Sequence, residues 1–123
     1  MQNEILLVAQ SVSGEKGLPQ DSIFEAIELA MATATKKRYQ EPSNIEVIID
    51  RDSGEYETYR CWEVVEEEDF EHEGIHLTLD QAKKKDESIS LGLMIKEKIK
   101  NTKITLGYKV DSYSPSKFFK EHH

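Results

Sequence analysis

The sequence predicts an α+β fold, in which an N-terminal helical hairpin packs beside a small antiparallel β-sheet and is followed by a short helix and a C-terminal helical connector. Two observations support this prediction. Apolar residues recur every three or four positions within residues 3–13 and 18–42, as they do on one face of an α helix. After Pro42 the period changes to two, which is typical of β strands.

The length of 123 residues is enough for one modest core. We expect a head over residues 1–92 and a divergent or truncated C-terminal body or connector segment over residues 93–123. Residues 1–92 hold 9 Lys/Arg against 21 Asp/Glu, whereas residues 93–123 hold 7 against 3. Because phosphate backbones are repelled by excess negative charge, the first part is not expected to be a general nucleic-acid surface.

The single cysteine, Cys61, cannot form an intrachain disulfide, which suits a reducing compartment. No apolar run reaches the roughly 18 residues of a membrane span, and the N-terminus lacks a basic region followed by an apolar stretch. We therefore expect a cytoplasmic protein that makes no membrane contact.

The first helix is expected over residues 3–13, with Asn3 as its N-cap. Ile5, Leu6, Val8, Ala9 and Val12 form its apolar stripe. Leu7 lies off that stripe and is expected to be exposed.

The second helix is expected between Leu18 and Pro42. Pro19 and Asp21 favour a helix start, and the basic residues Lys36, Lys37 and Arg38 favour its end through the helix dipole. Its expected apolar stripe consists of Ile23, Ile27, Ala30 and Ala34. The alanines at 26, 30, 32 and 34 would allow a neighbouring helix or sheet to approach closely.

Alternating residues predict a β-hairpin, with strands at 45–49 and 56–65 and a turn at 50–54. Trp62 is expected to be the large anchor between the sheet and the helices, and an exposed platform of Trp62 and Tyr59 is the alternative. A solvated acidic loop at 66–69, a third short strand around 75–79, a short helix at 78–85 capped by Thr78, and a sharp turn at 90–92 should follow.

The last thirty residues carry two conflicting patterns. Leu91, Ile95 and Ile99 have helical spacing, whereas Ile104 to Val110 alternate as a strand does. The end at 114–123 has no clear period. Its final Glu-His-His resembles the remnant of a purification tag and is excluded from functional argument.

Residue types that carry catalysis are present without the arrangement that catalysis needs. The glycines are scattered singly, so no phosphate-binding loop is predicted. His72 and His76 are four residues apart, but Gly74 lies between them and the segment resembles a loop entering a strand, so a metal site is not expected. Cys61 lacks nearby oxyanion donors and is expected to be a packing residue. We expect no enzyme activity and no cofactor.

Five segments resemble the N-terminal domain of the bacterial transcription elongation and termination factor NusA. They are NEIL at 3–6, VSGEKGLP at 12–19, IFEAIELAMATATKKRY at 23–39, VIIDRDSGEYETYRCW at 47–62 and LTLDQAKKKDESISLG at 77–92. The resemblance ends after Gly92. It implies an α/β head that binds RNA polymerase at the flap beside the RNA exit channel and modulates pausing, termination and antitermination.

The resemblance also implies sites and partners. The flap-tip helix of the polymerase β subunit is expected to contact Leu29, Met31 and Ala32 on the less buried side of the second helix, together with Leu7. The basic cluster Lys36, Lys37 and Arg38 is expected to face a nascent RNA hairpin, and the chain is expected to be a monomer.

Two alternatives from other functional classes remain open. One is a small RNA-binding protein that uses the basic aromatic segment from Tyr108 to Lys120. The other is a small hydrolase centred on Cys61.

Overall fold

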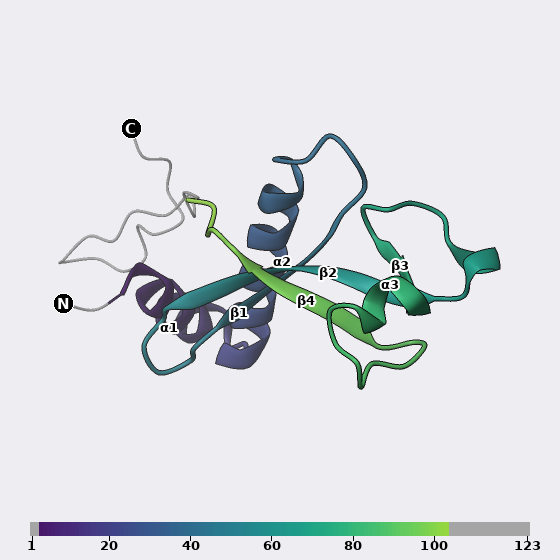
Figure 1. Cartoon of the computed structure of the whole chain (residues 1–123). Coiled ribbons are helices and arrows are strands. Elements are labelled where there is room, and N and C mark those ends of the chain that lie inside the picture. Colours follow the sequence, from purple (N-terminus) through teal and green to yellow (C-terminus); the bar gives the residue numbers. More distant parts are fainter. Residues whose placement is uncertain (1–2, 104–123) are drawn as a thin grey trace.

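The computed structural model describes residues 3–103 of the chain (Figure 1). It contains helices and a four-stranded sheet, and this confirms the α+β class predicted from the sequence. In chain order the elements are α1 (Glu4–Lys16), α2 (Gln20–Lys36), β1 (Asn44–Ile49), β2 (Tyr56–Val65), the 3-10 helix η1 (Glu67–Asp69), β3 (His76–Thr78), α3 (Leu79–Lys83) and β4 (Met94–Ile99).

Capping residues next to each end of helix α1 fix where it begins and ends. Asn3 is its N-cap, and the side-chain Oδ1 of Asn3 accepts a hydrogen bond of 2.7 Å from the Ile5 N–H. Gly17 follows the last residue with a φ of 67°, and its N–H donates to the carbonyl of Ser13. Residues 17–19 then connect directly to α2, and the two helices pack against each other as the predicted helical pair.

The first hydrophobic core lies between α1, α2 and one face of the hairpin formed by β1 and β2. Arg51, in the hairpin turn, fastens this face to α2. Its guanidinium carbon lies 4.9 Å from the centre of the Phe24 ring, and it pairs with Glu28, which also accepts the Ile49 N–H at 2.9 Å. The buried members of the first core are Ile5, Val8, Ala9, Val12, Ile23, Phe24, Ile27, Met31, Ala32, Val47 and Ile49.

Strand β2 is the centre of the sheet. Strand β1 runs antiparallel to its first half, β4 runs antiparallel along its other side, and β3 runs parallel to its last three residues. The sheet is therefore mixed, whereas the sequence predicted a small antiparallel sheet. The segment 66–75 carries the chain back past the end of β2, so that β3 leaves in the same direction as β2.

The predicted C-terminal helical connector is also wrong, because residues 94–99 form strand β4. Ile95 and Ile99 are four residues apart, and this spacing places two side chains on one face of a helix but also on one face of a strand. Thr58 pairs with Ile99 and Glu63 with Met94, so residues beyond position 92 belong to the same sheet as the head. The alternating residues 104–110 and the end at 114–123 lie outside the described part of the chain.

A second, smaller core lies at the far end of β2, away from α1 (Figure 1). Val64, Ala82, Ile89 and Ile95 are its buried members. Helix α3 covers it and begins with the predicted cap. The Thr78 hydroxyl accepts the Gln81 N–H at 3.3 Å, and the Thr78 N–H donates to the Gln81 side chain at 3.0 Å.

Trp62 belongs to neither of these two cores, so its predicted role as the anchor between sheet and helices is wrong. The pairing of β1 ends opposite Cys61, and Trp62 lies beyond it. The indole N–H of Trp62 donates to the Glu73 carbonyl at 3.1 Å. The guanidinium of Arg60 lies 5.0 Å from the Trp62 ring and 4.4 Å from the Tyr39 ring, which ties the segment after α2 to the sheet.

Among the helices in residues 3–103, none combines the length and apolar character required to cross a lipid bilayer.

Candidate functional site

Helix α2 presents an exposed apolar stripe on the side that faces away from the first core. The stripe consists of Ala26, Leu29, Ala30 and Thr33, which are three, four and seven residues apart and therefore share one helix face. Leu29 is 70% exposed and lies at the centre. The Thr33 hydroxyl donates to the Leu29 carbonyl at 2.9 Å, so this polar group is satisfied within the helix. We call these four residues the α2 stripe.

The α2 stripe differs from the surface expected from the sequence. Met31 is 2% exposed and Ala32 is 7% exposed, so the expectation that they lie on the less buried side of α2 is wrong. Met31 follows Ile27 by four residues and therefore turns into the same core. Leu7 is half-buried and packs against that core rather than being exposed. Of the four residues expected to contact the polymerase, only Leu29 is highly exposed.

The alanines of α2 are divided between its two sides. Ala26 and Ala30 are exposed and Ala34 is half-buried, whereas only Ala32 is fully buried. The expected close approach of another element of the fold to all four alanines is therefore wrong. The core is filled instead by the larger side chains at 23, 24, 27 and 31.

The basic cluster at the end of α2 also has two kinds of member. The Arg38 guanidinium donates to the Lys100 carbonyl at 2.8 Å and to the Thr102 hydroxyl at 2.9 Å. Arg38 therefore fastens the segment after β4 to the end of α2. Within residues 3–103, the exposed side chains of Lys36 and Lys37 make no hydrogen bond or ion pair, so they remain available to an anionic partner.

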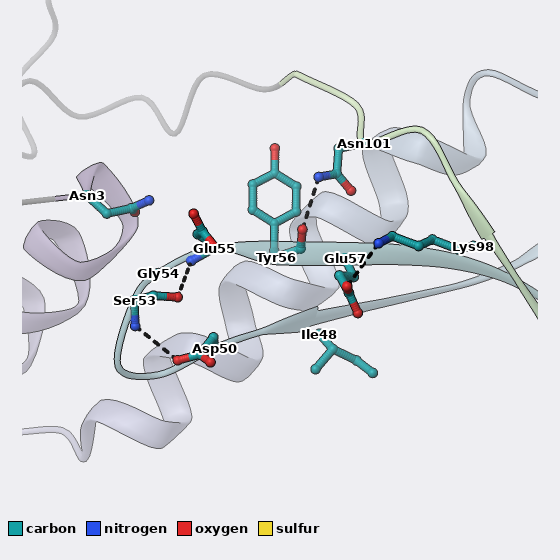
Figure 2. A pocket seen from close by; sticks show the side chains of 10 residues that line it. All are labelled: Asn3, Ile48, Asp50, Ser53, Gly54, Glu55, Tyr56, Glu57, Lys98 and Asn101. Carbon is teal, nitrogen blue, oxygen red and sulfur yellow. Dashed lines mark hydrogen bonds and ion pairs between the residues drawn. The ribbon is translucent and has the colours of Figure 1, made fainter.

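A pocket of about 710 Å³ lies at the turn end of the hairpin (Figure 2). Its lining residues are Asn3, Ile48, Asp50, Ser53, Gly54, Glu55, Tyr56, Glu57, Lys98 and Asn101. Figure 2 shows Lys98 reaching from β4 to Glu57 on β2, and Asn101 lying beside the Tyr56 backbone.

Two of the three carboxylates that line this pocket, Asp50 and Glu57, make structural contacts. Asp50 accepts the N–H groups of Ser53 and Asp52 at 3.0 and 2.8 Å, and these hydrogen bonds lower the pKa of its carboxyl group. The Tyr59 hydroxyl and then the Lys98 ammonium lower the pKa of Glu57. Both carboxyl groups are therefore ionised at neutral pH, whereas a general acid requires a raised pKa.

The other residues considered for chemistry have structural contacts. The Nδ1 atom of His72 accepts the Gly74 N–H at 2.8 Å, and the Nδ1 atom of His76 accepts the Glu71 N–H at 3.0 Å. Cys61 is buried in β2, and its burial, followed by the nearby charge of Glu46, raises the pKa of its thiol and disfavours the reactive thiolate. In the described part of the chain, no group of three His, Cys, Asp or Glu side chains is placed to hold a metal ion.

The polymerase contacts expected from the sequence did not include three positions of the α2 stripe, at 26, 30 and 33. The signal was present in the sequence, because positions 26, 29, 30 and 33 have helical spacing of their own. Alanine and threonine are weakly apolar, and the stronger stripe at 23, 27 and 31 lies on the other side. The basic aromatic segment of the alternative RNA-binding hypothesis lies outside the described residues.

Comparison with known proteins places the chain in a family. The family described as the NusA N-terminal domain matches residues 4–107. The transcription termination/antitermination protein NusA of Halalkalibacterium halodurans is 31% identical over 83 residues, which cover 68% of this chain and 21% of that protein. The protein of the same name from Rickettsia prowazekii is 32% identical over 89 residues, which cover 72% of this chain and 17% of that protein.

The fold agrees with these matches. The solution structure of the N-terminal domain of NusA from B. subtilis matches with a TM-score of 0.62 and 22% sequence identity, over 81% of this chain and 79% of that one. The chain spans about a fifth of the length of the curated relatives it matches. With residues 4–107 matched, the chain belongs to the family of NusA N-terminal domains.

Proposed function

We propose that this chain is the polymerase-binding module of a transcription termination/antitermination factor. It would dock on RNA polymerase at the flap beside the RNA exit channel and so modulate pausing, termination and antitermination. The support is membership of the NusA N-terminal domain family, whose full-length relatives carry that name. The observation that carries the proposal is the α2 stripe, a fixed apolar surface with a 70% exposed leucine at its centre.

The α2 stripe suits an amphipathic helix such as the flap-tip helix of the polymerase β subunit. Ala26 and Ala30 have small side chains, so a second helix could approach the α2 backbone closely. Leu29 would insert between the apolar residues of that helix, and its removal from water would be the main gain in free energy. A surface of this size supports moderate affinity, with a Kd on the order of micromolar.

Lys36 and Lys37 extend this surface with positive charge at the C-terminal end of α2. In the proposed complex they would contact the phosphates of an RNA hairpin that emerges beside the flap. Arg38 is left out of this role because its guanidinium is already bonded to residues 100 and 102.

The docking proposal is tested by adding a synthetic flap-tip helix peptide to the ¹⁵N-labelled chain and recording amide shifts. The largest shifts are expected along α2, and Leu29→Glu should weaken binding at least tenfold because a carboxylate would be desolvated at the centre of the contact. Ile48→Glu is the matched control, since Ile48 is also an exposed apolar residue, 47% exposed, but lies on the face of β1 opposite to the buried Val47 and Ile49 that face α2. Shifts that avoid α2, or equal binding by Leu29→Glu and the parent chain, would contradict the proposal.

The RNA role is tested with the double variant Lys36→Glu/Lys37→Glu. It should shorten hairpin-stabilised pauses by roughly twofold to tenfold, because two phosphate contacts are lost, while the peptide Kd stays unchanged. The control is Lys83→Glu/Lys84→Glu, an exposed lysine pair on and beside α3. A parallel loss of pausing and peptide binding would show that the two lysines have no separate role toward RNA.

A further inference from the structure

Figure 1 shows the end of the sheet that lies farthest from α1, where β2 meets β3 and β4 begins. This end of the sheet carries a second group of exposed apolar residues. Leu91 is 43% exposed, Leu93 is 49% exposed and Met94 is 40% exposed. Leu91 and Leu93 lie in the turn that leads into β4, and Met94 is the first residue of that strand. Large apolar residues scattered singly need no explanation, whereas here three exposed ones lie within four positions of the chain.

The backbone beneath these side chains is fixed. Gly92 has a φ of 85°, and its N–H donates to the Val64 carbonyl at 2.9 Å. The Leu93 carbonyl in turn accepts the Val64 N–H at 2.9 Å, and the Leu93 N–H donates to the Ser90 carbonyl at 3.2 Å. Because the backbone of this turn is hydrogen-bonded to the end of β2, the sheet fixes the backbone that carries the exposed side chains of Leu91 and Leu93. A partner would therefore bind without ordering the turn first.

A hollow of about 310 Å³ opens beside Leu91. Leu79 and Leu91 contribute its large apolar side chains, while Glu66, Glu67 and Glu68 line it with negative charge. All three glutamates are exposed, and in residues 3–103 none of them forms a salt bridge. Their charge is therefore not neutralised by the fold. We call this hollow, together with Leu93, the distal surface.

We propose that the distal surface binds a basic amphipathic segment of another protein. A large apolar side chain of that segment would enter the hollow between Leu79 and Leu91, and its flanking Lys or Arg residues would face Glu66–Glu68. This site is separate from the α2 stripe and does not depend on the proposed polymerase contact.

Charge decides among the possible occupants. A nucleic acid would bring phosphates to three unneutralised carboxylates and would be repelled. A second copy of this chain, paired through the same surface, would place the glutamates of both copies close together. A basic amphipathic segment alone matches both the glutamates and the two leucines that line the hollow.

The test uses a fluorescein-labelled hexapeptide of alternating leucine and lysine, with the 123-residue chain as its target. Binding should be detected by fluorescence anisotropy, and ¹⁵N amide shifts should map to residues 66–68, 79–80 and 91–94. The double variant Leu91→Ser/Leu93→Ser should weaken binding about tenfold, because the partner then buries less apolar surface. Glu66→Gln/Glu67→Gln should weaken it several-fold and reduce its dependence on salt.

Matched controls distinguish binding at the distal surface from nonspecific binding of the peptide. Leu18→Ser removes another exposed leucine, 46% exposed, from the loop between α1 and α2, and should leave hexapeptide binding unchanged. Peptides with serine in place of leucine, or glutamate in place of lysine, should not bind. The proposal is overturned if the hexapeptide fails to bind at millimolar concentration, if the Leu91 and Leu93 double variant binds it normally, or if sedimentation shows a dimer that this double variant abolishes. Binding of the flap-tip peptide by the same variant tests the docking proposal independently.

Discussion

Met31→Ala is expected to lower the free energy of unfolding by about 2–5 kcal/mol. Met31 is 2% exposed and lies in the first core together with Ile27 and Phe24 of the same helix. Removing its side chain leaves a cavity that the surrounding helices and hairpin can fill only in part. Urea unfolding followed by circular dichroism measures the change.

Leu29→Ala is the matched variant, because it removes a similar volume from the opposite side of α2. Leu29 is 70% exposed, so the free energy of unfolding should change by no more than about 0.5 kcal/mol. The two variants also separate stability from binding, since Leu29→Ala should weaken binding of the flap-tip peptide without destabilising the fold. Equal losses of stability in the two variants would mean that α2 turns a different face to the core.

Gly74→Ala is expected to destabilise the chain by about 3 kcal/mol, the upper end of the usual effect of overpacking. A Cβ atom at this position would overlap the backbone carbonyl oxygen of Pro42 and lie 3.0 Å from Nδ1 of His72. The contacted oxygen of Pro42 is a backbone atom, so a side-chain rotation cannot relieve the contact. The shift would also disturb the hydrogen bond from Arg60 to the Gly74 carbonyl. The urea midpoint should fall accordingly.

Gly14→Ala provides the comparison for this effect. Gly14 lies within α1, and a Cβ atom there would meet no atom within 4 Å. Alanine favours a helix over glycine, so this variant should be neutral or more stable by up to about 1 kcal/mol. If Gly74→Ala unfolds at the same urea concentration as Gly14→Ala, the close approach of residues 42 and 74 is not a constraint on the fold.

Features set by neighbouring residues were predictable from the sequence. The Asn3 cap, the hairpin turn at 50–54 and the Thr78 cap each depend on side chains within a few positions, and all three are confirmed. The existence of α2 was equally clear. Its orientation was not, because α2 has apolar residues on two faces and periodicity alone does not say which face is buried.

Features that depend on distant residues were missed. Arg38 resembles an ordinary basic residue at a helix end until the segment at 100–102 is placed beside it. The parallel pairing of β3 depends on the path of the loop before it, and β4 could not be distinguished from a helix by two isoleucines four residues apart. All four expected polymerase contacts were predicted to be accessible, but only Leu29 is highly exposed, because packing of the core decides which face of α2 is buried.

The central position of β2 in the sheet determines the order in which parts of this chain can fold during synthesis. Helices α1 and α2 and the first hairpin come early in the chain, but one whole side of β2 finds its partner only in residues 94–99. During synthesis the N-terminal helices can therefore fold against the hairpin while that side of β2 still faces solvent and any chaperone nearby. Residue 99 must leave the ribosome before the pairing of β2 with β4 can be completed. A chain cut at residue 92 would lack β4, and that side of β2 would stay unpaired.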